Sequence, residues 1–375
     1  GSPSERREGD TKAMAPSSSL VVALSAATGL VVAVGLMRRG AKGKKQVPRE
    51  PLESEDTGRG VEEERVCKQG FKPSLVPKDL DLIVIGSGVG GLVTACMMAK
   101  QGKKVLVLEQ HDQAGGNLHT FEEQGWEFDT GLHYVGNMGN TNYGNRRLID
   151  YCCDTPVEWA PMDSVYDTAV FRTEEVQRSM TASTRTEYRM RSDQGIKGVI
   201  ADMKKWFPGE EAAIDEYFRL CKHASWGMKW LLIRNLLPRP LGVLLGWVFD
   251  YTSLSYFYKT TQEVLSTLTS NHKLTGVLTY MWGDYGLPPS CSAFGIHAAL
   301  QTHYCSRGAF YPVGGPSALA RAMVRTIERR GGKVLVRAAV DSVTLSGWGN
   351  VTGVRLEAGD EVEAGTVVST VGAVR

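Results

Sequence analysis

Residues 81–91 read DLIVIGSGVGG, and the expected architecture follows from this stretch. The apolar, β-branched run from Leu82 to Ile85 is typical of a strand that is buried on both faces. After the glycine turn, a helical pattern continues to Lys100 with an apolar stripe of mostly small side chains, namely Leu92, Ala95, Cys96 and Ala99. A second apolar run, Val105 to Leu108, follows the turn at Gly102. The pattern therefore predicts a strand, a tight turn, a helix and a parallel second strand.

The glycines of this turn have the spacing of a dinucleotide-binding site. Gly86 permits the sharp turn, Gly88 lets a pyrophosphate approach the backbone, and Gly91 lets helix and strand pack closely. The helix N-terminus offers N–H groups and a partial positive charge to phosphate oxygens. Glu109 ends the second strand about 20 residues further on, where a carboxylate can bind ribose hydroxyls. We therefore predict an adenine-dinucleotide site; the alternative is a βαβ unit whose glycines serve only packing.

A second glycine pair follows the expected ribose-binding acid. Gly115 and Gly116 form a backbone segment that can approach a cofactor closely. The block that they begin, through residues 125–136, resembles the second signature of two-dinucleotide-binding flavoproteins. A simple nicotinamide dehydrogenase would more often continue with an uninterrupted strand–helix–strand unit. The glycine pair therefore favours a flavoprotein.

Composition restricts the classes of function. Lys and Arg total 43 against 41 Asp and Glu, a net charge of +2, so charge alone indicates no nucleic-acid partner. The seven cysteines are scattered and show neither a metal-ligand spacing nor a disulfide framework. We therefore expect no metal site, free thiols and a reducing compartment. At 375 residues the chain can hold two domains, or one domain with an insertion.

Residues 1–45 contain a candidate membrane anchor, and Met14 is a candidate natural start. The segment 20–37 carries no charge and approaches the roughly 20 apolar residues that a spanning helix needs. Basic residues follow it directly, which predicts a cytosolic C-terminal side: Arg38, Arg39, Lys42, Lys44 and Lys45. A cleaved signal peptide is the alternative. Residues 46–80 are expected to form a charged, polar linker.

The pattern is looser between residues 151 and 305. A helix is expected from Glu210 through Leu220. The unusually apolar stretch 226–257 follows, and Pro238 and Pro240 divide it into two short helical pieces, each too short to span a bilayer. This stretch is either a helical lip that rests on a membrane and admits a lipid substrate, or a buried helical hairpin.

Glycine-turn chemistry returns after residue 305. The segment 310–317, FYPVGGPS, precedes an expected helix that ends at Gly331-Gly332. Its apolar face consists of Leu319, Ala322, Met323 and Ile327. Strands are then expected at 334–336, 340–345, 351–354 and 366–370.

These motifs together resemble the carotenoid and retinoid oxidoreductase family, which includes phytoene desaturases and carotenoid isomerases. The resemblance extends from about residue 80 to the C-terminus and is most specific to the retinoid-saturating branch. The residues that carry it are 83–88, 103–116, 128–136 (FDTGLHYVG), 292–294 with His297, and 310–315. It implies an α/β fold with an FAD-binding Rossmann-like domain of the two-dinucleotide-binding flavoprotein type, formed by 81–150 and 306–375. Residues 151–305 would be an inserted, membrane-facing helical substrate domain.

The resemblance also implies a cofactor, its contacts and a reaction. FAD would be held by the residues Gly86, Ser87, Gly88, Gly91, Glu109, Gly115, Gly116 and, through its backbone at the adenine, Val340. The implied reaction saturates the 13–14 double bond of all-trans-retinol to give 13,14-dihydroretinol, with NAD or NADP as candidate electron donors. The expected location is the endoplasmic reticulum membrane, with the catalytic part in the cytosol.

Two other functions remain open, and no protein partner can be inferred. One keeps the cofactor but desaturates or isomerises a carotenoid. The other is non-enzymatic binding of a lipid or a prenylated protein on the same fold. We assign no catalytic side chain: His133, His297 and His303 lie in the matching segments and could donate a proton, but each is more commonly structural.

The sequence departs from the family in two places. Asn117-Leu118 stand where the family has paired cysteines, so a redox role for such thiols is not expected. The family also continues beyond the position of Arg375 with a segment that returns to the flavin. We therefore expect the C-terminal part of the family fold to be missing from this chain.

Overall fold

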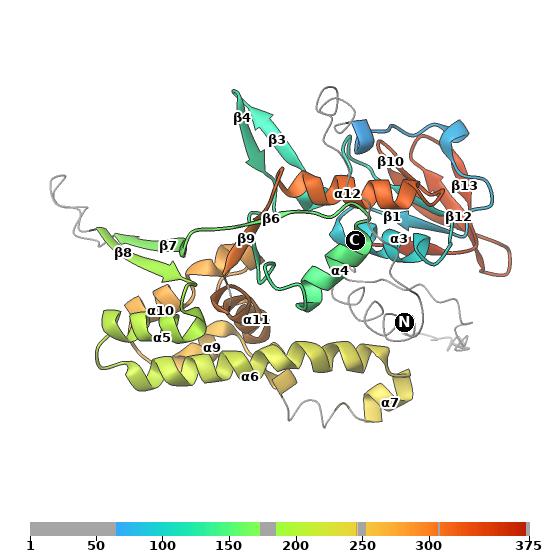
Figure 1. Ribbon diagram of the computed structural model, residues 1–375. Helices are drawn as coiled ribbons and strands as arrows, with labels where there is room; N and C mark the ends of the chain where they lie inside the picture. Colours follow the sequence, from blue (N-terminus) through green and yellow to red (C-terminus); the bar gives the residue numbers. More distant parts are fainter. Residues whose placement is uncertain (1–64, 173–184, 245, 247–252, 307, 373–375) are drawn as a thin grey trace, which may run out of the picture.

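The computed structural model describes residues 65–172, 185–244, 246, 253–306 and 308–372 (Figure 1). The expected anchor at 20–37 and the first part of the expected linker lie outside these ranges. Within them, no helix is both long enough and apolar enough to cross a bilayer. The last part of the expected linker packs on the fold, because Cys67 is buried and the N–H of Phe71 donates to the carbonyl of Val336.

A four-stranded parallel sheet forms the centre of the nucleotide-binding part. Its order is β10-β2-β1-β14, with β1 at Leu82–Ile85, β2 at Val105–Leu108, β10 at Lys333–Leu335 and β14 at Val367–Ser369. Helix α3 (Val89–Ala99) connects β1 to β2. The predicted strand–turn–helix–strand unit is confirmed. The late strands β10 and β14 join it from segments more than 200 residues away in the chain.

Side chains alternate between the two faces of this sheet, as the period of a strand requires. Val84 and Val107 lie in a core with α3 and with α12 (Pro316–Glu328). Ile83 and Leu106 instead pack on an antiparallel sheet of β11 (Val340–Leu345), β12 (Val351–Leu356) and β13 (Glu361–Glu363). The predicted apolar stripes of α3 and α12 are buried. Helices cover one face of the parallel sheet and a second sheet covers the other.

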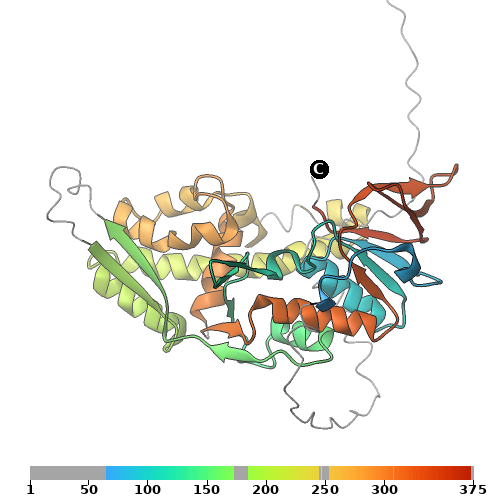
Figure 2. The same ribbon diagram turned by 90° about the horizontal axis from the view of Figure 1, so that it is seen from above.

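The intervening residues build a second part with its own core. It contains the hairpin β7 (Val165–Arg172) and β8 (Arg185–Arg191), with α5 (Gly195–Trp206), α6 (Glu211–Leu236) and α11 (Phe294–Cys305). Figures 1 and 2 show the hairpin at one end of the molecule, the parallel sheet at the other, and α6 extending between them. A small antiparallel sheet, β5-β9-β6, joins the parts. Its strands are β5 (Val135–Gly136), β6 (Trp159–Pro161) and β9 (Ala309–Pro312).

Short elements complete the described chain. Helix α9 (Thr261–Ser266) begins with a capping box formed by Thr260 and Glu263. The others are η1 (Pro73–Leu75), η2 (Gly116–Leu118), β3 (Thr120–Glu123), β4 (Trp126–Asp129), α4 (Gly144–Cys152), α7 (Arg239–Leu244), η4 (Ser253–Phe257), α10 (His272–Leu278) and η5 (Tyr280–Tyr285).

The predicted end of the helix near Leu220 is wrong, because α6 continues to Leu236 without a break. The first of the two expected short helical pieces is therefore the C-terminal half of α6. Gly227 is tolerated in the middle of this helix because it serves packing: an added Cβ would lie 2.6 Å from the carbonyl oxygen of Ser253 in η4. Pro238 does mark the end of α6, and α7 follows.

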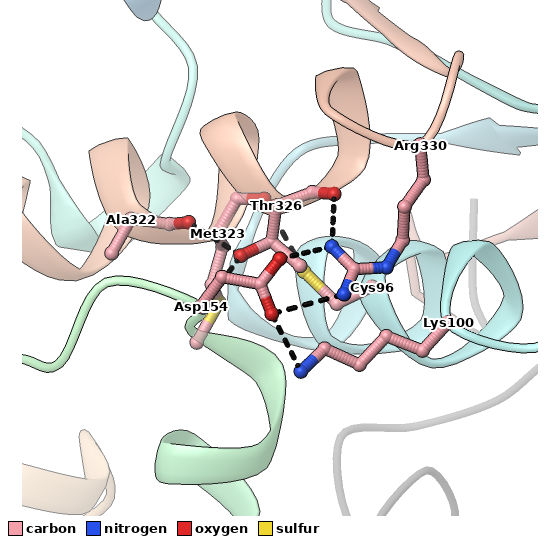
Figure 3. Close-up of polar contacts among 7 residues, drawn as sticks. All are labelled: Cys96, Lys100, Asp154, Ala322, Met323, Thr326 and Arg330. Atoms are coloured by element: carbon pink, nitrogen blue, oxygen red, sulfur yellow. Dashed lines mark hydrogen bonds and ion pairs between the residues drawn. The ribbon is translucent and has the colours of Figure 1, made fainter. Parts of the chain in front are cut away.

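An ion cluster links α3, α12 and the residue that follows α4 (Figure 3). Asp154, just after α4, forms ion pairs with Lys100 at the end of α3 and with Arg330 after α12. The backbone N–H of Asp154 donates to Oγ1 of Thr326 at 2.9 Å. Burial opposes ionisation of this carboxyl, but the bonds from Arg330 and Lys100 outweigh it and lower the pKa of Asp154. The cluster therefore positions the helix that begins at the glycine turn.

Candidate functional site

Ser87 is the centre of the glycine turn. Its backbone N–H and its hydroxyl both donate to Oε2 of Glu109, at 2.8 and 2.6 Å. The same hydroxyl oxygen accepts a hydrogen bond from the N–H of Gly115 at 3.0 Å. The structure thus brings the turn, the predicted ribose-binding acid and the second glycine pair into one buried network.

Glu109 is held in its ionised form. Burial alone raises its pKa, but hydrogen bonds from the N–H of His111 and from Ser87 outweigh burial, so the pKa lies below its usual value. Oε1 accepts only the N–H of His111, at 3.0 Å, among the described residues. A carboxylate oxygen can accept more than one hydrogen bond, so Oε1 retains capacity for a ribose hydroxyl.

Each glycine of the first turn has a distinct environment. Gly86 has φ +93°, a conformation that favours glycine. A Cβ on Gly91 would overlap the carbonyl oxygen of Gly86, which explains the close packing of α3 on the turn. A Cβ on Gly88, in contrast, would meet no atom of the described residues within 4 Å. A ligand can therefore approach the backbone at Gly88, whereas at Gly91 the carbonyl of Gly86 already occupies the space.

The second glycine pair lies against the first turn. Gly115 and Gly116 have φ values of +130° and +55°. A Cβ on Gly116 would lie 2.9 Å from Cα of Gly88. No side chain of the described residues caps α3, so the N–H groups of its first turn are available to a phosphate. These observations fit the pyrophosphate of a dinucleotide.

Two further residues border this site. Thr370, just after β14, donates its hydroxyl to the carbonyl of Ile85 at 2.8 Å, a contact that the sequence analysis did not single out. Only the pairing of β14 with β1 reveals it. Val340 begins β11, two residues after Ala338, whose N–H donates to the carbonyl of Glu109. Its role at the adenine stays a prediction.

The three histidines have different environments. His297 is fully buried, and its ring nitrogens contact the hydroxyls of Tyr217 at 2.6 Å and Tyr285 at 3.1 Å. Nε2 of His303 accepts the N–H of Gly136 at 2.8 Å. Burial lowers the pKa of both to about 4, so both are neutral near pH 7. These contacts favour structural roles for the two. His133, in contrast, is exposed near Asp129.

The sheet, the glycine turn and the carboxylate define an FAD-binding flavoprotein fold of the α/β class. The chain belongs to the flavin containing amine oxidoreductase family, whose sequence model matches residues 89–373. A solved oxidoreductase from Methanosarcina mazei shares the fold, with a TM-score of 0.51 and 14% identity over 77% of this chain and 58% of that chain. Bound FAD would supply hydride chemistry, and the residues described above would hold it.

Curated relatives have more specific names. The chain is similar to an all-trans-retinol 13,14-reductase from Danio rerio, 41% identical over 331 residues, which are 86% of this chain and 52% of that protein. An inactive all-trans-retinol 13,14-reductase from the same organism is 36% identical over 82% of this chain and 50% of its own length. A prolycopene isomerase from an Oncidium hybrid is 28% identical over 78% of this chain and 48% of its own length. The chain thus spans about half the length of these relatives.

Proposed function

We propose that this protein is a flavin-dependent oxidoreductase that saturates the 13–14 double bond of all-trans-retinol to give 13,14-dihydroretinol. The observation that carries the proposal is the 41% identity to a protein of that name over 86% of the chain. The network from Gly115 through Ser87 to Glu109 supports the cofactor part of the proposal, because it holds both glycine turns and the carboxylate in the arrangement that an adenine dinucleotide requires.

In this proposal the chain binds and orients rather than reacts. The glycine turns hold the pyrophosphate and Glu109 holds the ribose, while the apolar substrate is enclosed away from water. NADH and NADPH are the candidate electron donors. We do not assign the proton donor to His297 or His303, since both rings are buried and already hydrogen-bonded.

We also propose that the protein contacts the endoplasmic reticulum membrane through α6 and α7. Trp226, Trp230 and Ile233 follow at i, i+4 and i+7 on α6 and are 54, 39 and 43% exposed. Leu241 and Val243 on α7 are 45 and 80% exposed. This exposure differs from the buried hairpin that was one interpretation of the sequence. We call these five side chains the apolar face. Such a face suits the interface of a bilayer.

The membrane proposal has a direct test. A triple variant with Trp226→Ser, Trp230→Ser and Val243→Ser is compared with the wild type in flotation with phosphatidylcholine vesicles. All proteins in this test begin at residue 46, so that the expected anchor at 20–37 does not itself bind the vesicles. Trp348→Ser is the matched control, because Trp348 is 90% exposed but lies in the turn between β11 and β12. We expect the triple variant alone to lose flotation. Equal flotation of all three proteins would contradict the proposed face.

The activity is tested by product analysis. The purified protein is loaded with FAD, reduced without oxygen, and mixed with all-trans-retinol; extracted retinoids are then identified by mass spectrometry. We expect a product two mass units heavier than retinol from the wild type, and little from Glu109→Gln. Isomerised carotene without retinol reduction would favour the isomerase alternative, for which the 28% identity to the prolycopene isomerase is the support. Tight retinol binding without flavin would favour a binding protein.

A further inference from the structure

A pocket of about 690 Å³ lies between α6, α11 and the segment that leads into α4. Met228 of α6 and Ala299 and Leu300 of α11 supply apolar lining. The polar side chains at its wall include Tyr143 and His303. Its volume lies within the range of about 300–1,000 Å³ that is usual for small-molecule sites. Seven further polar residues line the pocket: Asn137, Asn140, Asn145, Ser225, Lys229, Thr302 and Ser306. The combination of an apolar wall with polar groups suits an apolar ligand with one polar end.

The hydrogen bonds of His303 determine which atom can face a ligand. The N–H of Gly136 donates to Nε2 at 2.8 Å, so Nε2 carries no hydrogen. In the neutral ring the hydrogen is then on Nδ1, which lies 3.2 Å from the hydroxyl oxygen of Tyr143. Nδ1 therefore donates to this oxygen. The side chain of Asn137 also hydrogen-bonds this hydroxyl. Burial raises the pKa of Tyr143, and the bond from Asn137 acts to lower it, as a donor to the oxygen does. With both neighbours donating, the hydroxyl hydrogen of Tyr143 is left to donate elsewhere.

The backbone holds this arrangement in place. A Cβ on Gly136 would overlap the carbonyl oxygen of His303, so only glycine lets β5 approach the imidazole closely enough for its N–H to reach Nε2. The carbonyl of His303 accepts Nδ2 of Asn137 at 2.9 Å. Two adjacent residues of one segment thus fix both the ring and the backbone of His303. Tyr143 consequently faces a ring of defined tautomer.

We propose that this pocket binds the oxygen-bearing end of an elongated apolar molecule. The Tyr143 hydroxyl donates to that oxygen, and the apolar part of the molecule lies against Met228, Ala299 and Leu300. Given the proposed function, on which the choice of ligand rests, the molecule is a retinoid with a terminal hydroxyl. His303 is a positioning residue that orients Tyr143. Neither residue needs to take part in hydride transfer.

The pocket and part of the apolar face lie on the same stretch of α6. Lys229 lines the pocket, and its ammonium group lies 3.9 Å from the ring centroid of Trp226, a member of the apolar face. Met228 and Lys229 therefore lie on the same helical turns as the exposed side chains Trp226 and Trp230.

Binding measurements test the proposal independently of turnover. All-trans-retinol and the same polyene without its hydroxyl are titrated into the protein, and energy transfer from tryptophan to the polyene is recorded. We expect the wild type to bind retinol more tightly than the hydrocarbon by about three- to tenfold, the range of one net hydrogen bond. Tyr143→Phe should lose this preference. Tyr151→Phe in α4 is the matched control and should keep it.

A second pair of variants tests the apolar wall. Leu300→Trp should weaken binding of both ligands by at least tenfold, because the larger side chain fills the pocket. If circular dichroism shows that Leu300→Trp does not fold, Met228→Phe is used in its place. Unchanged retinol affinity in the filled variant, or a retained hydroxyl preference in Tyr143→Phe, would overturn the proposal. If binding follows the expected pattern but no dihydroretinol forms, the pocket stands and the proposed reaction fails. If dihydroretinol forms while the filled variant binds retinol normally, the reaction stands and the pocket is wrong.

Discussion

The hydroxyl of Ser87 lies 2.6 Å from Oε2 of Glu109, although 22 positions separate the two residues in the chain. The bond joins the first turn to the end of the neighbouring parallel strand. It also orients the carboxylate, since Oε2 is occupied by Ser87 and Oε1 lies toward His111. The acid that should bind the ribose is therefore positioned before any cofactor arrives.

Substitution of Glu109 should reduce flavin binding. Glu109→Gln keeps the size but replaces one acceptor oxygen by an N–H₂ group, which only donates. Ser87 and His111, which donate to different oxygens of Glu109, then lose one of their two acceptors. We expect a strong loss of bound FAD in Glu109→Gln and a smaller loss of bound FAD in Ser87→Ala. Ser87→Ala should also lower the free energy of unfolding by about 1–2 kcal/mol. The ratio of flavin to protein absorbance in the purified variants is the measurement. Parent-like flavin content in Glu109→Gln would remove the basis of the site.

Gly88 and Gly91 should respond oppositely to the same added methyl group. Gly91→Ala should destabilise the fold by several kcal/mol, because its Cβ overlaps the carbonyl oxygen of Gly86. Gly88→Ala should fold normally, since its Cβ meets no atom within 4 Å in the part of the chain that the structure describes, and the φ of Gly88 is −59°. It should nevertheless bind FAD more weakly. Thermal unfolding and flavin content separate the two effects; a fully stable Gly91→Ala would contradict the close packing.

Loss of the charge at Asp154 should destabilise the nucleotide-binding part. Asp154→Asn leaves Lys100 and Arg330 without their shared partner, and we expect a cost of about 1–3 kcal/mol. Asp193→Asn is the matched control, because its pair with Arg191 is more exposed to solvent and should contribute less to stability. Urea unfolding measures both. Equal effects of the two substitutions would show that the cluster is no stronger than a surface pair.

Stability should fall with pH below about 6.5 because of the two buried histidines. Their pKa values are lowered from 6.5 to about 4, so the folded state resists protonation while the unfolded state takes up protons. The contribution of the two neutral rings to the free energy of unfolding is complete above pH 6.5, and it is lost as the pH falls toward 4. Glu109 and Asp154 also have lowered pKa values, and they should act only at lower pH, near and below their usual values.

The measurement is the free energy of unfolding between pH 7 and pH 4. His303→Gln should flatten part of this slope, and it should lower stability at pH 7 because the N–H of Gly136 loses its acceptor or keeps a weaker one. A pH-independent wild type over this range would show that neither ring is protected from protonation.

Local patterns in the sequence were sufficient for the nucleotide-binding unit. The apolar runs of β1 and β2, the stripe of α3 and the face of α12 are all as predicted, because periodicity reports burial when a segment has one dominant packing partner. The first glycine turn was predictable because glycine is required where φ is positive or where two backbones meet. That requirement shows directly in the residue type at each position.

Long-range contacts decided what the sequence could not. The length of α6 was missed because packing of Gly227 on Ser253 outweighs a local weakness in the helix. The exposure of Trp226 and Trp230 was undecidable, since an apolar helix face does not say what covers it. The contact of Tyr143 with His303 joins residues 160 positions apart. By itself the sequence determined the dinucleotide unit, because its interactions are local or periodic; tertiary structure alone decided the second core, the apolar face and the pocket, because each depends on distant segments meeting.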